Sequence, residues 1–118
     1  MSEIRVTTVS DTAGTGPVTL TKQSAAKVYA HFNGTGTVEI RDSLNAASLV
    51  DNSTGHYDVN FSNAMGNTTY AVQTNDISYG NGWAESLTTT SYDTRRRNES
   101  AAYIDSSTIW GLVHGDLA

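Results

Sequence analysis

The chain has 118 residues, a formal net charge of -5 at pH 7 and no cysteine. A chain of this length is expected to form one domain, and the absence of cysteine excludes disulfides and thiolate-ligated zinc. The negative charge argues against non-specific binding to the phosphate backbone of nucleic acid, and no apolar run has the length that spans a bilayer.

Few residues are available for a hydrophobic core. Leu, Ile, Val and Phe together make about 19% of the chain, near the level below which chains tend to be disordered. The net charge is modest, however, and disorder usually combines low hydrophobicity with strong self-repulsion. Whether the chain folds therefore depends on where the apolar residues are placed.

Residues 1–25 are expected to form an N-terminal arm or edge element that docks on a neighbour. The segments EIRVTTV and GPVTLT have the composition of short strands and are separated by SDTAGT. Pro17, the only proline, has no amide hydrogen and suits a strand start or a sheet edge. Residues 26–118 are expected to form the folded domain.

Apolar and polar residues alternate in four segments between residues 28 and 73. A strand points successive side chains to opposite faces, so each segment has one face for a core and one for water. Turn-forming residues at 52–55, 65–67 and 76–82 separate these segments. We predict an all-β fold, an antiparallel β-sandwich of jelly-roll type, with helix only locally around 23–27 or 98–103. The residues expected to face the core are Val28, Ala30, Phe32, Val38, Ile40, Tyr57, Val59, Phe61, Tyr70 and Val72.

The motif Asn33-Gly34-Thr35-Gly36 lies between the first two alternating segments. Glycines at this spacing can begin a phosphate-binding loop, but that loop needs a third glycine or a following Gly-Lys-Ser/Thr, and both are absent. Asn-Gly between alternating strands is a strong hairpin signal because both residues tolerate positive φ. The motif therefore predicts a hairpin with positive φ at Gly34.

The segment STIWGLVHG, near the C-terminus, is apolar at both alternating sets of positions. Ile109 and Val113 fall on one face of a strand, and Trp110 and Leu112 fall on the other. Such a strand is expected to be covered on both sides, either in the centre of a sheet or at a subunit contact.

No catalytic, cofactor or metal site is predicted. His31, His56 and His114 are far apart in the sequence and are expected to be separate surface residues that do not converge with carboxylates. Glu39 and Asp58 alternate with core residues and should face solvent, without the buried neighbours that raise the pKa of a catalytic carboxyl.

Residues between 79 and 97 form a candidate contact surface. The run Arg95–Arg97 contains three of the seven basic residues. It is interpreted either as a solvated or subunit-pairing segment or as a contact for phosphate or carboxylate groups. Trp83, beside a glycine-rich stretch, is interpreted either as a core anchor or as a ring that stacks on sugars. The candidate host- or neighbour-contact residues are Tyr79, Asn81, Trp83, Arg95, Arg96 and Arg97.

Residues 26–65, AKVYAHFNGTGTVEIRDSLNAASLVDNSTGHYDVNFSNAM, followed by TTYAV at 68–72, resemble a module of tailed-bacteriophage virion proteins. The resemblance is to small tail-fibre or fibre-tip proteins and to the C-terminal domains of longer fibres. Residues 8–22 resemble the leader that often precedes this module, and beyond Asn75 the resemblance fades. It implies an all-β sandwich, often trimeric, that is assembled on a virion and serves attachment, without catalytic residues.

The resulting expectation is a non-enzymatic structural protein of a tailed phage virion, of fibre or spike type, involved in host attachment. Its expected partners are further copies of itself in a homotrimer, other virion proteins, and a host surface glycan or protein. Neither nucleic acid nor membrane insertion is expected. The alternatives are a capsid decoration (cement) or head-fibre protein that stabilises the shell, and a carbohydrate-active enzyme.

Overall fold

The computed structural model describes residues 12–14, 25–77 and 81–118. Nearly all of the predicted arm, residues 1–25, lies outside these ranges. The regular elements within them are all β-strands, and no helix occurs there. The strands are β1 Val28–Asn33, β2 Glu39–Leu44, β3 Ala46–Ser53, β4 His56–Phe61, β5 Ala71–Asp76, β6 Asn81–Glu85, β7 Ser91–Arg97 and β8 Ile109–His114.

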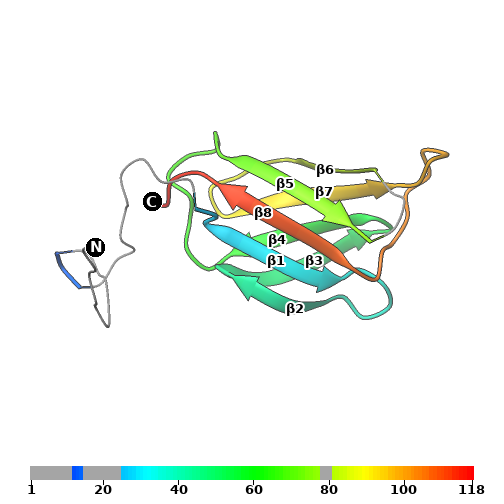
Figure 1. Cartoon of the computed structure of the whole chain (residues 1–118), viewed down its shortest axis with the longest axis horizontal. Coiled ribbons are helices and arrows are strands. Elements are labelled where there is room, and N and C mark those ends of the chain that lie inside the picture. The colour runs from blue at the N-terminus through cyan, green and yellow to red at the C-terminus, as the bar shows by residue number, and fades with distance from the viewer. Residues whose placement is uncertain (1–11, 15–24, 78–80) are drawn as a thin grey trace, which may run out of the picture.

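The strands form two four-stranded sheets that pack face to face (Figure 1). Sheet A has the strand order β2-β1-β8-β5, and sheet B has the order β3-β4-β7-β6. Neighbouring strands in both sheets run antiparallel. The predicted all-β antiparallel sandwich is confirmed, and its eight strands in two sheets match the size of a jelly roll.

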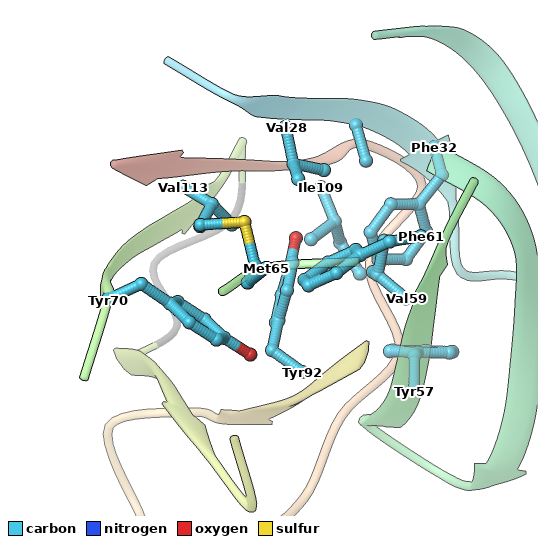
Figure 2. Close-up of a cluster of buried hydrophobic side chains, with 11 residues drawn as sticks. Val28, Phe32, Tyr57, Val59, Phe61, Met65, Tyr70, Tyr92, Ile109 and Val113 are labelled. Carbon is cyan, nitrogen blue, oxygen red and sulfur yellow. The ribbon is translucent and has the colours of Figure 1, made fainter. Parts of the chain in front are cut away.

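The core between the sheets is built from alternate residues of the strands, as the period of two predicts. In β1 and in β4 every second residue is buried. Aromatic rings meet between the sheets: the Phe32 and Tyr57 ring centroids lie 5.5 Å apart, edge to face. The buried hydrophobic residues, most of them labelled in Figure 2, are Val28, Ala30, Phe32, Tyr57, Val59, Phe61, Met65, Tyr70, Tyr92, Ile109 and Val113.

Three residues of the predicted core, Val38, Ile40 and Val72, are only partly buried. Val38 and Ile40 lie on or just before β2, and Val72 lies on β5. These two strands are the edges of sheet A, so each has a neighbouring strand on one side only. Because these strands lie at the edge of the sheet, their apolar residues alternate as predicted but are only partly covered by neighbours.

The hairpin predicted at Asn33-Gly34-Thr35-Gly36 joins β1 to β2, with Asn33 paired to Glu39. The Oδ1 of Asn33 accepts hydrogen bonds from the Thr35 amide at 3.2 Å and the Thr35 hydroxyl at 2.8 Å. The prediction of positive φ at Gly34 is wrong, because the positive φ of this loop is at Gly36, +62°. Gly34 is required by packing instead: a Cβ there would lie 2.7 Å from the hydroxyl oxygen of Tyr57.

Asn45 is the corner at which the chain passes from sheet A to sheet B. It lies between the end of β2 and the start of β3 and has a φ of +56°, a left-handed conformation that asparagine tolerates better than most residues. Its Oδ1 accepts a hydrogen bond from the Asn63 amide at 2.6 Å, and its Nδ2 donates to the Asn63 carbonyl at 3.1 Å. These bonds attach the corner to the connection that follows β4.

Three connections lie together at one end of the sandwich, termed here the loop end: residues 34–38, 54–55 and 98–108 (Figure 1). The Gly55 amide donates to Oδ1 of Asp105 at 2.8 Å. The Tyr57 hydroxyl lies 2.7 Å from the Gly34 carbonyl oxygen and 2.6 Å from Asp105 Oδ1, so it can donate to either. The long 98–108 connection is therefore attached to both hairpins that reach this end.

The start of that connection, residues 98–103, does not form the helix considered from the sequence. Oδ1 of Asn98 instead accepts hydrogen bonds from the amides of Ser100 and Ala102, each at 3.0 Å. An asparagine side chain that binds the following amides offers the backbone an alternative to helix. The segment is a turn that reverses the chain.

The opposite end, termed the terminal end, contains the start of β1 and the C-terminus. The Lys27 amide donates to the Val113 carbonyl at 2.7 Å, and the Ala118 amide donates to the Ala64 carbonyl at 2.9 Å. Residues 1–24 therefore connect to the sandwich at the end opposite the loop end.

Strand β8 is central, as one of the two sequence interpretations held, and pairs with β1 and β5 (Figure 1). Its inward residues Ile109 and Val113 are fully buried, whereas the outward residues Trp110 and Leu112 are half-buried. The strand was expected to be covered on both faces, but only its inward face is fully covered. Among the described residues there is no further layer over the outer face of sheet A.

Replacing Gly34 by alanine is expected to destabilise the fold by about 1–3 kcal/mol, because the added methyl group overlaps the Tyr57 ring and the Ile109 side chain. The free energy of unfolding from urea titration measures the effect. Gly66→Ala is the matched control, since a Cβ at Gly66 meets its nearest atom at 3.4 Å. Equal stability of the two variants would contradict the packing role of Gly34.

Stability should fall as the pH rises from about 10 to 12. Burial raises the pKa values of Tyr57, Tyr70 and Tyr92, that of Tyr70 to about 12. Above the pKa that a tyrosine has in the unfolded chain, the unfolded chain releases a proton that the folded chain retains. Each such tyrosine then lowers the free energy of unfolding by about 1.4 kcal/mol per pH unit. Tyr70→Phe should flatten the decline of urea midpoints between these pH values, and an unchanged slope would contradict this role for Tyr70.

Candidate functional site

Strand β7 directs its three consecutive arginines to two different faces of sheet B. Arg96 is fully buried and faces the interior, whereas Arg95 and Arg97 are partly exposed and face outward. The register of β6 with β7 places Trp83 opposite Arg95 and Asn81 opposite Arg97. These residues therefore share the outer face of sheet B.

The guanidinium of Arg96 lies between the two sheets. Its Nη1 is 3.6 Å from Oδ2 of Asp76, and neither side chain is exposed. Its Nη2 donates to the Thr74 hydroxyl and, at 2.8 Å, to the Asn75 carbonyl. Burial lowers the pKa of Arg96, and the Asp76 carboxylate opposes that shift. Because Arg96 belongs to sheet B and its partners belong to β5 of sheet A, this ion pair joins the sheets.

Gly82 provides the space that Arg96 occupies. A Cβ at Gly82 would lie 1.7 Å from Nη1 of Arg96. Gly82 is opposite Arg96 in the pairing of β6 with β7, so both face the interior. The prediction that Arg96 belongs to a contact surface is therefore wrong, because its side chain is inaccessible.

Trp83, Arg97 and Tyr103 form a cluster on the outer face near the loop end, termed the aromatic–arginine cluster. The Cζ of Arg97 lies 5.2 Å from the Trp83 ring centroid and 4.4 Å from the Tyr103 ring centroid. Nη2 of Arg97 donates to the Tyr103 hydroxyl at 2.7 Å. That hydrogen bond lowers the pKa of Tyr103, whose side chain is 40% exposed.

The cluster offers two kinds of contact to a ligand. Aromatic faces pack against the apolar face of a ring or chain and are attracted to cations. A guanidinium donates paired hydrogen bonds to carboxylate or phosphate groups. The arrangement suits a polar molecule that carries both an apolar surface and an anionic group.

Charged neighbours hold Trp83 in place. Its indole Nε1 donates to Oε2 of Glu85 at 3.4 Å. Glu85 forms an ion pair with Nε of Arg95, and Nη2 of Arg95 lies 3.5 Å from Oδ2 of Asp93. Trp83 is thus on the outer face of a strand and is not the core anchor considered from the sequence.

Five of the six predicted contact residues can be located in the structure. Tyr79 lies outside the described residues. The structure brings four of the others together on the outer face of sheet B: Asn81, Trp83, Arg95 and Arg97. The sequence interpretation missed Tyr103, which reaches Arg97 because the 98–108 connection folds back to form a bridge between them.

The surroundings of His31 and His56 differ from the expectation of isolated surface histidines. The His31 ring contacts the Trp110 ring, with centroids 6.4 Å apart. The prediction that no histidine converges with carboxylates is wrong for His56, whose Nε2 lies 2.7 Å from Oδ2 of Asp93. Asp58 is close to both. The register of β4 with β7, which creates this group, links strands far apart in the sequence.

Comparisons with protein-family models, with curated proteins and with solved structures find no match to this chain. The described residues contain no helix long and apolar enough to cross a membrane. The geometry of the outer face therefore carries the functional argument, together with the sequence.

Arg96→Ser is expected to cost about 3–5 kcal/mol of folding stability, because it leaves the Asp76 carboxylate buried without its cation. Arg95→Ser and Arg97→Ser, on the partly exposed outer face, should each cost clearly less folding stability than Arg96→Ser, because exposed ion pairs contribute little. Urea titration of the three variants measures the contrast. An Arg96→Ser variant as stable as the other two would contradict a structural role for the buried pair.

Proposed function

We propose that the chain is a non-enzymatic structural protein of a tailed phage virion, a fibre- or spike-type β-sandwich that takes part in host attachment. In this proposal it forms a homotrimer with other virion proteins as neighbours. The surface that contacts the host is the aromatic–arginine cluster together with the adjoining loop end. The ligand is a host surface glycan or protein.

The position of the cluster is the observation that carries this proposal. Arg97 is the last residue of β7, Trp83 lies in the middle of the neighbouring β6, and the 98–108 connection that contains Tyr103 folds back onto Arg97. Residues 1–24 connect at the opposite, terminal end. A sandwich held to a particle through its N-terminal segment would direct the loop end and the cluster away from the particle.

The resemblance of residues 8–72 to fibre modules supports the virion assignment. The residues that carry it in the described part are turn and core positions, such as the 33–36 loop and the strand that ends at Phe61. The cluster lies outside the resembling region. A shared scaffold with a separate contact surface suits a family whose members would attach to different hosts.

Symmetry would compensate for weak individual contacts. One cluster of a tryptophan, an arginine and a tyrosine offers a small contact area. Linked copies raise the effective concentration for each further contact, so avidity can exceed the affinity of one site by about 10²–10⁴. A homotrimer repeated on each particle would therefore bind a host surface without a deep pocket.

Removing the cluster should weaken attachment without unfolding the chain. Trp83→Ala and Arg97→Ser are each expected to reduce binding of the fluorescently labelled protein to host cell envelopes by about tenfold or more. Tyr103→Phe, which keeps the ring, should have a smaller effect than Tyr103→Ala. Lys27→Ser at the terminal end removes the same charge as Arg97→Ser and serves as the control. Unchanged binding of all the cluster variants would contradict the proposed contact surface.

The location of the protein on the particle tests the virion assignment separately. Gold-labelled antibody against the chain should mark the fibres or the tail tip of intact particles. Label spread over the head would replace this proposal with the capsid-decoration alternative. Particles without label would remove both assignments.

A further inference from the structure

A second group of side chains lies on the outer face of sheet B beside the aromatic–arginine cluster, and its His56 shares a row across the sheet with Arg95 and Trp83. His56 and Asp58 are alternate residues of β4, and the register of β4 with β7 places Asp93 directly opposite Asp58. One donor atom from each of the three residues lies within 4.8 Å of the others. His56 Nε2 and Asp93 Oδ2 are 2.7 Å apart.

The charges of this group are unbalanced. Like charges directly opposite one another on neighbouring strands are destabilising, and here Asp58 faces Asp93, which in turn faces Glu85. Arg95 contacts Glu85 and Asp93. Among the hydrogen bonds and ion pairs of the described residues, none reaches the Asp58 carboxylate. A cation between Asp58 and Asp93 would offset their repulsion.

Asp93 provides a second, independent observation. Its side chain is only 8% exposed, and its Oδ1 is buried without a hydrogen-bond partner in the described part of the chain. A buried carboxylate oxygen without a partner is costly and is unusual in folded proteins. The orphaned oxygen lies on the same carboxylate whose other oxygen already contacts His56.

We infer that His56, Asp58 and Asp93 bind a divalent metal ion, with zinc as the favoured ion. Zinc accepts imidazole nitrogen and carboxylate oxygen at about 2.0–2.2 Å, and three protein ligands leave a position open for water or a ligand. His56 Nε2 and Asp93 Oδ2, 2.7 Å apart, are hydrogen-bonded to each other without metal. A bound zinc ion would replace that hydrogen bond, and its tetrahedral geometry would place the two donor atoms about 3.3 Å apart. The imidazole distinguishes this donor set from the all-oxygen sets that magnesium and calcium prefer.

Arg95 has a defined place beside this site. Its Nη2 lies 3.5 Å from Asp93 Oδ2, and its Nε contacts Glu85. Carboxylates that ligate metals are themselves commonly oriented by outer hydrogen-bonding groups. Arg95 would orient Asp93 in this way, while its Nε pairs with Glu85 of β6.

Calorimetric titration of the chelator-treated, dialysed chain with zinc chloride tests the inference. One zinc ion per chain is expected to bind with a dissociation constant in the micromolar range or below, more tightly than magnesium or calcium. Asp58→Asn should weaken zinc binding by about tenfold or more. Asp51→Asn, which removes an exposed carboxylate elsewhere in sheet B, should leave it unchanged. Absence of zinc binding, or equal binding by the Asp58→Asn variant, would overturn the inference.

Thermal unfolding gives a second readout. Zinc should raise the melting temperature of the native chain and of the Asp51→Asn variant, because it binds the folded state. It should not raise that of the Asp58→Asn variant. Circular dichroism of each variant without zinc establishes that the fold is retained. A rise of equal size in the Asp58→Asn variant would show that zinc binds elsewhere and would also overturn the inference.

Discussion

The buried ion pair between Arg96 and Asp76 sets which side chains of strand β7 the protein displays. Removing a guanidinium from water is costly unless it is paired and hydrogen-bonded, and Arg96 has the Asp76 carboxylate, a hydroxyl and a carbonyl around it. Sliding β7 by one residue would expose Arg96 and drive Arg95 and Arg97 into the interior. The pair therefore fixes the register that places Arg95 and Arg97 on the outer face.

The core has few aliphatic residues, and its tyrosines also link the interior to the connections between strands. Tyr57 packs against Phe32 in the core, and its hydroxyl contacts Gly34 and Asp105 in two loops. Tyr70 is buried in the same core, and its hydroxyl donates to the carbonyls of Thr88 or Ser91. Tyrosine supplies both apolar area and a polar end. The loops are consequently held by the residues that fill the core.

The alternation of apolar residues was enough to predict the sandwich, and the Asn-Gly motif was enough to predict the hairpin after β1. The apolar pattern of β8 left open whether that strand is central or lies at a subunit contact. The alternation was not enough for residues whose position depends on distant partners. Arg96 follows the same period of two as Tyr92 and Thr94, but a triple arginine is usually solvated, so its burial was missed. Tyr103 and the His56–Asp93 contact depend on a folded-back loop and on the register of strands far apart in the sequence.

The central proposal is that the outer face of sheet B at the loop end contacts the host. Hydrogen–deuterium exchange of the protein bound to host cell-envelope fragments tests it most directly. Binding should slow exchange in residues 81–85 and 97–104 and leave the amides of β1, β2 and the terminal end unchanged. Protection confined to sheet A or to the terminal end would contradict the account.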